Sequence, residues 1–82
     1  MKVPRDLSGH ELASLLGRFG YSIVRQTGSH IRLTSTLKGK QHFITIPSHK
    51  VLSVGTLSAV LADVARYLEF ARKKLLEELF GP

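Results

Sequence analysis

The stretch YSIVRQTGSHIRLTSTLKGKQHFITIP, residues 21–47, decides the fold. It contains three short runs of strand-forming residues, Tyr21 to Arg25, His30 to Thr36 and Gln41 to Ile46. Turn residues that include a glycine separate these runs, and Pro47 ends the third one because proline cannot donate a ladder hydrogen bond. Short strands joined by short glycine-containing turns predict an antiparallel three-stranded meander.

Alternation within the second run predicts which side chains are exposed. Ile31 and Leu33 point to one face of the strand, whereas His30, Arg32 and Thr34 point to the other. Because a sheet that is covered on one face turns its aliphatic side chains toward the core, we expect His30 and Arg32 on the open face. His30 therefore has no packing reason to be buried.

A helix is predicted on each side of the strands. SGHE at residues 8–11 fits the capping box of a helix that runs to Phe19, and Gly20 is placed to end it. After the strands, apolar residues recur at helical spacing from a start near Gly55 or Thr56. The two apolar stripes consist of Leu12, Leu15, Leu16 and Phe19, and of Leu57, Val60, Leu61, Val64, Leu68, Leu75, Leu76 and Leu79. The element order is α-β-β-β-α, an α+β fold with the helices packed on one face of the sheet.

Length and charge narrow the class of protein. Eighty-two residues predict a single domain over 1–82, and a hydrophobic fraction of 43% is enough for a packed core. The formal net charge of +6 favours a polyanionic partner. Cysteine is absent from the sequence, which excludes disulfides and thiolate metal sites, and no apolar run is long enough to span a bilayer. We expect a cytoplasmic protein that does not enter the membrane.

The four histidines are the first candidates for chemistry. His10 breaks the apolar stripe of its helix and is expected to be solvated. His42 is interpreted as a cross-strand surface residue, and His49 is expected to shape the loop after Pro47. No pair of histidines has HxxxH spacing, and no nucleotide-binding motif is present. We therefore expect neither a metal site nor a small-molecule cofactor.

His30 remains, next to a basic surface. The cations expected in the sheet and its loops are Arg25, Arg32, Lys38, Lys40 and Lys50. RNA is a polyanion that one imidazole can help to cleave, because the 2′-hydroxyl is an internal nucleophile and only proton transfer and charge stabilisation are needed. Ser29 cannot be paired with His30 from adjacency alone, since strand geometry would point the two side chains apart. On the residues alone, a structural histidine at a sheet edge remains the competing interpretation.

Four segments keep their order and spacing in a way that is specific to one family: LSGHELASLLGRFGY, VRQTGSHIRL, ITIPSHKVLSVGTL and LADVARYL. They resemble the HicA-type, or YcfA-like, toxins, the mRNA interferases of type II toxin–antitoxin pairs. The resemblance covers nearly the whole chain and implies a fold like that of a double-stranded-RNA-binding domain. It also implies RNA cleavage without a metal cofactor, with His30 as the essential general acid or base, and inhibition by a HicB-like antitoxin that covers this histidine.

Other positions of the motif are assigned supporting roles. Gly28 is expected to take a conformation that a Cβ would strain. Ser29 is expected to fix the turn through a backbone hydrogen bond. Arg25, Arg32 and Lys50 are candidate contacts to RNA or to the antitoxin.

The carboxyl end departs from the family pattern. Between Thr56 and Phe80 there is no Gly or Pro, so periodicity predicts one helix about 37 Å long at about 1.5 Å per residue. Related chains commonly break this helix with a Gly and then a Ser, where Glu69 and Ala71 stand here, and neither of these residues ends or caps a helix well. From the resemblance and from compactness we expect a break at 69–71 and a short extra C-terminal helix.

Two other functions fit parts of this sequence. A non-catalytic double-stranded-RNA-binding module would share the fold, although no lysine cluster marks the start of the second helix, where such modules hold phosphates. A basic protein that only binds an acidic protein partner would share the charge. RNA cleavage separates the toxin from both of these alternatives.

Overall fold

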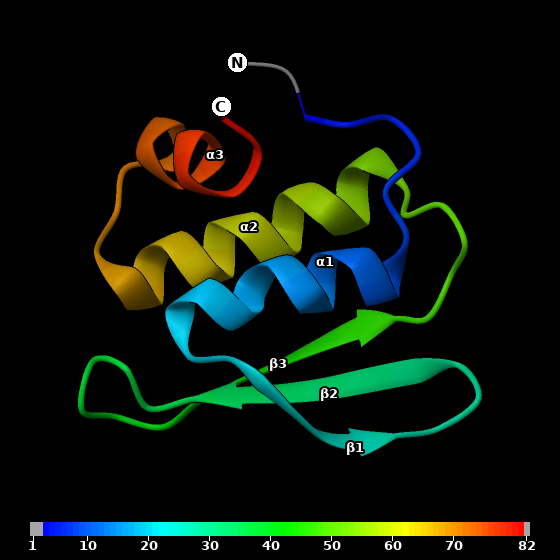
Figure 1. Ribbon diagram of the computed structural model, residues 1–82, viewed down its shortest axis with the longest axis horizontal. Coiled ribbons are helices and arrows are strands. Elements are labelled where there is room, and N and C mark those ends of the chain that lie inside the picture. Colours follow the sequence, from blue (N-terminus) through cyan, green and yellow to red (C-terminus); the bar gives the residue numbers. More distant parts are fainter. Residues whose placement is uncertain (1–2, 82) are drawn as a thin grey trace.

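A computed structural model describes residues 3–81, in which two helices cover one face of a three-stranded antiparallel sheet and a third, C-terminal helix packs on the side of these helices away from the sheet (Figure 1). The sheet order is β1-β2-β3. The elements are α1 (Gly9–Leu16), the 3-10 turn η1 (Gly17–Phe19), β1 (Ser22–Gln26), β2 (His30–Ser35), β3 (His42–Pro47), α2 (Val54–Leu68) and α3 (Arg72–Phe80). The predicted α+β fold, resembling a double-stranded-RNA-binding domain, is confirmed. Figure 1 also shows that α1 and α2 both begin over the end of the sheet that holds the β1–β2 turn.

The two faces of the sheet separate as the alternation predicts. On β2, Ile31 and Leu33 are fully buried, while His30 and Arg32 are exposed. The face turned away from the helices is called the outer face below. It also carries Thr45, because residues paired across two strands share a face and Thr45 pairs with Arg32.

Helix α1 begins as expected and ends earlier than expected. The Ser8 hydroxyl accepts the Glu11 N–H at 3.0 Å, and a Glu11 carboxylate oxygen accepts the Ser8 N–H at 2.9 Å. Hydrogen bonding of the Glu11 carboxylate to Ser8, first to its backbone N–H and then to its side chain, holds the pKa of Glu11 below its ordinary value. The α-helix stops at Leu16 and tightens into a 3-10 turn to Phe19, a common end to a helix. Gly20 then takes the left-handed conformation (φ +79°) that the sequence predicts.

Helix α2 begins before the predicted position. The N-cap is Ser53, whose hydroxyl accepts the Thr56 N–H at 3.2 Å, so the helix starts at Val54. The expected cap at Gly55 or Thr56 was wrong. A serine hydroxyl three residues upstream satisfies a free N–H, which a glycine cannot do.

The break in the last helix is confirmed. Glu69 ends α2 in a left-handed conformation (φ 61°), and Ala71 begins α3 without a side-chain cap. One straight helix of about 37 Å, at about 1.5 Å per residue, would exceed the longest dimension of the molecule, 31 Å. Phe70 lies between the helices with its ring edge-on to Phe19, 5.6 Å between centroids.

Among residues 3–81, none of the helices has both the length and the apolar character that crossing a membrane requires.

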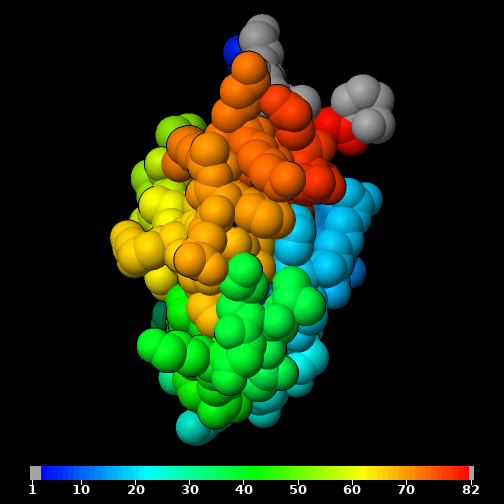
Figure 2. Space-filling view, turned by 90° about the vertical axis from the view of Figure 1, so that its left-hand side faces the viewer, coloured from blue at the N-terminus to red at the C-terminus, as the bar shows by residue number. Residues whose placement is uncertain are grey.

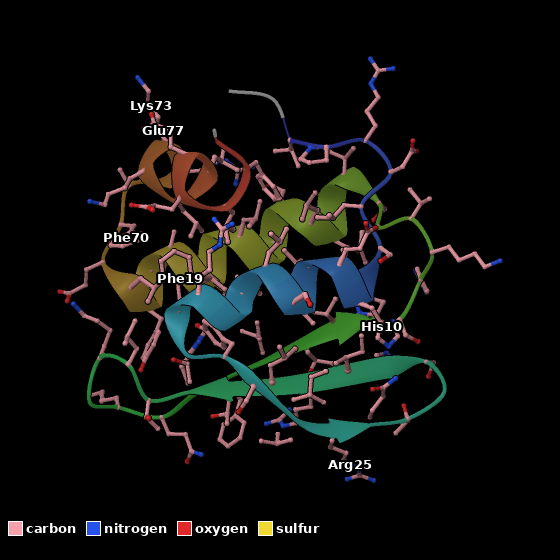
Figure 3. All side chains as sticks on the ribbon, in the orientation of Figure 1. His10, Phe19, Arg25, Phe70, Lys73 and Glu77 are labelled. Carbon is pink, nitrogen blue, oxygen red and sulfur yellow. The ribbon has the colours of Figure 1, made fainter. Side chains whose placement is uncertain are left out.

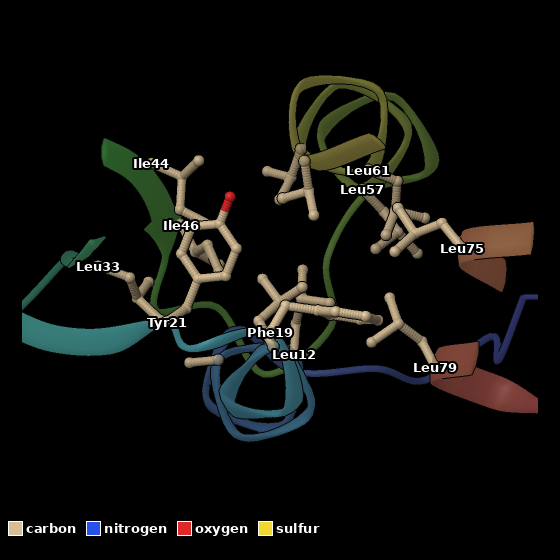
Figure 4. Close-up of a cluster of buried hydrophobic side chains, with 14 of the residues drawn as sticks. Leu12, Phe19, Tyr21, Leu33, Ile44, Ile46, Leu57, Leu61, Leu75 and Leu79 are labelled. Atoms are coloured by element: carbon tan, nitrogen blue, oxygen red, sulfur yellow. The ribbon is translucent and has the colours of Figure 1, made fainter. Parts of the chain in front are cut away.

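The core lies between the sheet and the helices. Figure 4 shows side chains from β2, β3, α1, α2 and α3 converging on one cluster. The predicted stripes are buried, except that Leu15 is only partly buried and packs at the margin. Ser35 is the buried polar side chain of this core, and its hydroxyl donates to the Phe19 carbonyl at 2.7 Å. The helices and the core thus cover one face of the sheet and leave its outer face exposed.

Candidate functional site

The β1–β2 turn, residues 27–29, presents His30 at the first position of β2. Thr27 closes this turn: its N–H donates to the His30 carbonyl at 2.9 Å, and its hydroxyl accepts the His30 N–H at 3.1 Å. The expectation that Ser29 would bond the backbone was therefore wrong. Thr27 makes the side-chain bond to the backbone of the turn instead, and its two bonds fix the backbone of His30.

Ser29 instead contacts the imidazole. Its Oγ lies 3.0 Å from His30 Nδ1. The expected divergence of the two side chains was wrong because Ser29 precedes the strand, where alternation does not apply. His30 Nε2 has no hydrogen-bond partner within residues 3–81. The imidazole is thus held at one nitrogen and open at the other, the arrangement that proton transfer to a ligand requires.

A second segment, from the end of β3, supports the same turn. The Ser48 N–H donates to the Ser29 carbonyl at 3.0 Å, and the Ser48 hydroxyl donates to the Gly28 carbonyl at 2.8 Å. Pro47 is the register partner of His30, so Ser48 continues the ladder past the end of the strand. Sequence reasoning did not single out Ser48. Its position next to Pro47 indicates this contact only when the pairing of β2 with β3 is known.

Gly28 does not act as expected. Its φ lies outside the left-handed range, and a Cβ added to it meets no atom within 4 Å. The interpretation that a side chain would strain this position was wrong, because the turn is held by side chains of its neighbours and not by a special backbone angle. Gly28 leaves open space beside His30.

The start of α1 packs against this end of the sheet. The Gly9 N–H donates to the His49 carbonyl at 3.0 Å, and a Cβ on Gly9 would lie only 2.0 Å from the Pro47 carbonyl oxygen. His10 Nε2 lies 2.8 Å from the side-chain nitrogen of Gln26, and Figure 3 shows His10 between α1 and the end of the sheet. His10 is exposed as expected, but it also links helix to strand. The contact of His49 is made by its backbone, in agreement with a loop-shaping role.

The predicted basic residues lie on or near the outer face. Arg25 pairs with Arg32 across β1 and β2, and Figure 3 shows Arg25 projecting away from the helices. The Arg32 guanidinium donates to the Thr45 hydroxyl at 3.4 Å. Lys50 is exposed in the loop between β3 and α2, two residues beyond Ser48. The structure therefore brings Arg25 and Arg32 together and leaves Lys50 on the adjoining loop.

His42 lies at the opposite end of the β2–β3 pair, where its side chain faces the helices and is only partly exposed. Its Nδ1 is 2.7 Å from the Tyr21 hydroxyl and its Nε2 is 3.2 Å from an Asp63 carboxylate oxygen. Its ring stacks on Tyr67, 4.6 Å between centroids. The expectation of a surface position was wrong, because His42 lies two residues before the buried Ile44, shares its face of the strand and so faces the helices.

This cluster ties α2 to the β2–β3 turn. Tyr67 accepts the Lys38 N–H at 3.0 Å and bonds the Lys40 carbonyl, and Lys38 pairs with Glu69 at 3.3 Å. Figure 2 shows the turn directly beneath the end of α2. Burial, and then the nearby Tyr67 and Asp63, raise the pKa of Tyr21 well above its usual value. Tyr21 thus stays protonated and can donate to His42.

Metal-ligating side chains do not gather anywhere in the described part of the chain. Within residues 3–81 no three His, Cys, Asp or Glu side chains lie close enough together to hold a metal ion. His30 has Ser29 as its side-chain neighbour, and His42 has two tyrosines and a single carboxylate.

Comparisons with known proteins place the chain in a family. No curated protein and no solved structure matches it. One family model, described as "HicA toxin of bacterial toxin-antitoxin", matches residues 9–65, more than half of the chain. The match runs from α1 through the sheet into α2, and so it includes the turn that presents His30 and the Ser48 segment that supports it. The chain therefore belongs to the HicA family of toxins from bacterial toxin–antitoxin systems.

Proposed function

We propose that this toxin is a metal-independent endoribonuclease that cleaves mRNA with His30 as general acid or base. The observation that carries the proposal is the state of the His30 side chain. It is exposed on the outer face, bonded at Nδ1 by Ser29 and open at Nε2. An imidazole held in this way can take a proton from the 2′-hydroxyl of bound RNA, or give one to the departing 5′-oxygen, without first breaking a contact inside the protein.

The contact with Ser29 fits two protonation forms of the imidazole, and each has a role. When Nδ1 carries the hydrogen and donates to Ser29 Oγ, Nε2 has a lone pair and removes the proton of the RNA 2′-hydroxyl. The 2′-oxygen then attacks phosphorus, and the bond to the 5′-oxygen breaks. When Nε2 carries the hydrogen, it protonates the departing 5′-oxygen. In either role His30 acts on a nucleophile that RNA itself supplies, so no metal-bound water is required.

The surrounding charges support an anionic substrate. Arg25 and Arg32 lie on the same face as His30, and Lys50 lies on the loop that follows Ser48. Guanidinium groups bind phosphate oxygens in a bidentate way and stabilise the charge of a pentacoordinate phosphorus. We assign Arg25, Arg32 and Lys50 to RNA contacts that are shared with the antitoxin.

Neutralisation follows from the exposure of the site. A HicB-like antitoxin that covers the outer face at His30 would block the access of RNA without altering the fold. The net charge of +6 favours an acidic surface on that partner. We propose that the toxin acts in the cytoplasm, where it meets its mRNA substrate.

The test compares wild type with His30→Ala on a defined single-stranded RNA, with a chelator present throughout. Wild type should cleave with chelator and leave 2′,3′-cyclic phosphate and 5′-hydroxyl ends, since the 2′-oxygen is the nucleophile. His30→Ala should lose about 10²–10⁴-fold in rate, the usual contribution of a positioned proton-transfer group. Unchanged cleavage by the variant would refute the role of His30. Duplex binding without any cleavage by wild type would instead favour a non-catalytic double-stranded-RNA-binding module.

A further inference from the structure

The outer face carries an aromatic side chain that the core does not need. Phe43 lies on β3 opposite Thr34 of β2, and 41% of its surface is exposed. Its strand neighbour Ile44 supplies the buried contact on the helical face. Phe43 therefore presents an exposed aromatic surface on the outer face, and a planar ligand that covered this ring would gain the free energy of its burial.

Arg32 holds this ring ready for a flat ligand. The centre of its guanidinium lies 4.6 Å from the Phe43 ring centroid, and one of its nitrogens donates to the Thr45 hydroxyl at 3.4 Å. A cation over an aromatic face is attracted by the ring quadrupole. The two planar groups are therefore ordered before any ligand binds. Bases of single-stranded nucleic acid stack on both kinds of surface, aromatic rings and guanidinium planes.

A β-bulge brings a second arginine to the same place. Ile23 pairs with Leu33, but Arg25, two residues on, pairs with Arg32, so Val24 is an extra residue in β1. In a regular ladder Arg25 would oppose Ile31 and point toward the helices. The bulge turns Arg25 onto the outer face instead, which is the usual effect of such an insertion on a side chain.

The resulting pair of arginines is unfavourable in the free protein. Like charges directly opposite each other in a sheet destabilise it. Neither Arg25 nor Arg32 forms an ion pair within residues 3–81. A phosphodiester bound by these two arginines would offset the repulsion, because guanidinium groups bind phosphate oxygens in a bidentate way.

We propose that the outer face is a single-strand RNA subsite, in which Phe43 and Arg32 stack an unpaired base and Arg25 with Arg32 binds the adjoining phosphate. This inference rests on the proposed ribonuclease function and adds the form of its substrate. Along β2 the step from His30 to Thr34, the partner of Phe43, is about 13 Å at about 3.3 Å per residue. The stacked base therefore belongs to a nucleotide near the cleaved bond and not to the bond itself.

The subsite distinguishes single strands from duplexes. In a duplex each base is already stacked between its neighbours, so its flat surface is not available to Phe43. In a single strand it is. A protein whose fold resembles a duplex-binding domain would thus select unpaired RNA through a face that the helices leave open.

The binding test uses a single-stranded 2′-O-methyl oligonucleotide, which lacks the internal nucleophile and cannot be cut by the proposed route. Phe43→Ala should weaken its binding about 5- to 150-fold, the alanine effect expected for one stacked base. Phe43→Trp should retain the affinity of the wild type because it keeps an aromatic face. Leu37→Ala, at an exposed apolar residue of the β2–β3 turn, is the matched control and should change nothing. Equal losses for the duplex of the same sequence would overturn base stacking.

An abasic scan separates stacking from other contacts. One abasic position in the oligonucleotide should weaken wild-type binding and abolish the difference between wild type and Phe43→Ala. If Phe43→Ala binds single strands as wild type does, the subsite is refuted while cleavage by His30 stands. If instead wild type cuts no RNA, the ribonuclease proposal fails and the binding results still decide the subsite. A defect confined to binding of the purified cognate antitoxin would reassign Phe43 to a protein interface.

Discussion

The two ends of the β2–β3 pair each carry a histidine, and the two imidazoles are held in opposite ways. His30, paired with Pro47, has one side-chain hydrogen bond within residues 3–81, to Ser29, and an open Nε2. His42, paired with Ser35, has both ring nitrogens bonded, by Tyr21 and Asp63, and one face stacked on Tyr67.

This difference in hydrogen bonding suggests that one histidine serves catalysis and the other serves stability. A closed set of hydrogen bonds makes an imidazole part of the structure, because a ring nitrogen can exchange a proton with a ligand only after one of these bonds is broken. An imidazole with one open nitrogen can exchange protons with a ligand. The end at His30 should therefore govern activity, and the end at His42 should govern the free energy of unfolding. Four substitutions test this division, from the largest expected effect to the smallest.

His30→Ala should remove activity alone. RNA cleavage should fall about 10²–10⁴-fold, whereas the thermal midpoint should stay within the range of neutral surface substitutions, because the side chain is exposed and leaves no buried partner unpaired. Cleavage kinetics and calorimetry on the same preparation measure both. A large loss of stability would mean that His30 is structural and would break the comparison.

His42→Ala should produce the reverse result. Losing the ring leaves the Tyr21 hydroxyl unpaired in a buried place and removes the stacking on Tyr67, together about 2–4 kcal/mol of stability. Cleavage per folded molecule should not change. Urea unfolding measures the loss, and adding Tyr21→Phe should cost less than the sum of the single changes, since it removes the orphaned hydroxyl.

Gly9→Ala should disturb the His30 end through the backbone. The new methyl would overlap the Pro47 carbonyl, so α1 or β3 must move, at about 1–3 kcal/mol. Gly28→Ala is the matched control, because its Cβ meets open space and should leave the melting temperature unchanged. If activity nevertheless falls in Gly28→Ala, the glycine serves the approach of substrate. Equal melting temperatures for all three proteins would contradict the close packing at Gly9.

Ala71→Ser should stabilise the protein without touching either histidine. Ala71 has the extended backbone of an N-cap (φ −65°, ψ 147°) but no side-chain acceptor. A serine there should add about 1 kcal/mol, and so raise the melting temperature by about 4–8 °C. Ala71→Val adds no side-chain acceptor at this exposed position and serves as the control. A change in cleavage rate at temperatures where both proteins are folded would show that stability and activity are not separable here.

The two histidines also show how far the sequence could be read. Alternation around Ile31 put His30 on the outer face. The same rule around Ile44 and Ile46 would have turned His42 inward, so that error was avoidable. The contact of Ser29 with the imidazole could not be predicted in this way, because the side chain of a residue that precedes a strand does not follow the alternation of the strand. The contact of Ser48 with the turn could not be predicted either, because it depends on the register in which β2 and β3 pair.

The sequence by itself determined the strands, the capping box of α1, the apolar stripes and the face on which His30 lies. Each of these follows from a local period or from a bond that spans a few residues. Only the tertiary structure decided the contact of Ser48 with the turn, the bulge that turns Arg25 outward and the Tyr21–His42–Asp63 cluster. These features join segments that are distant in the chain, and their geometry depends on where packing brings those segments together.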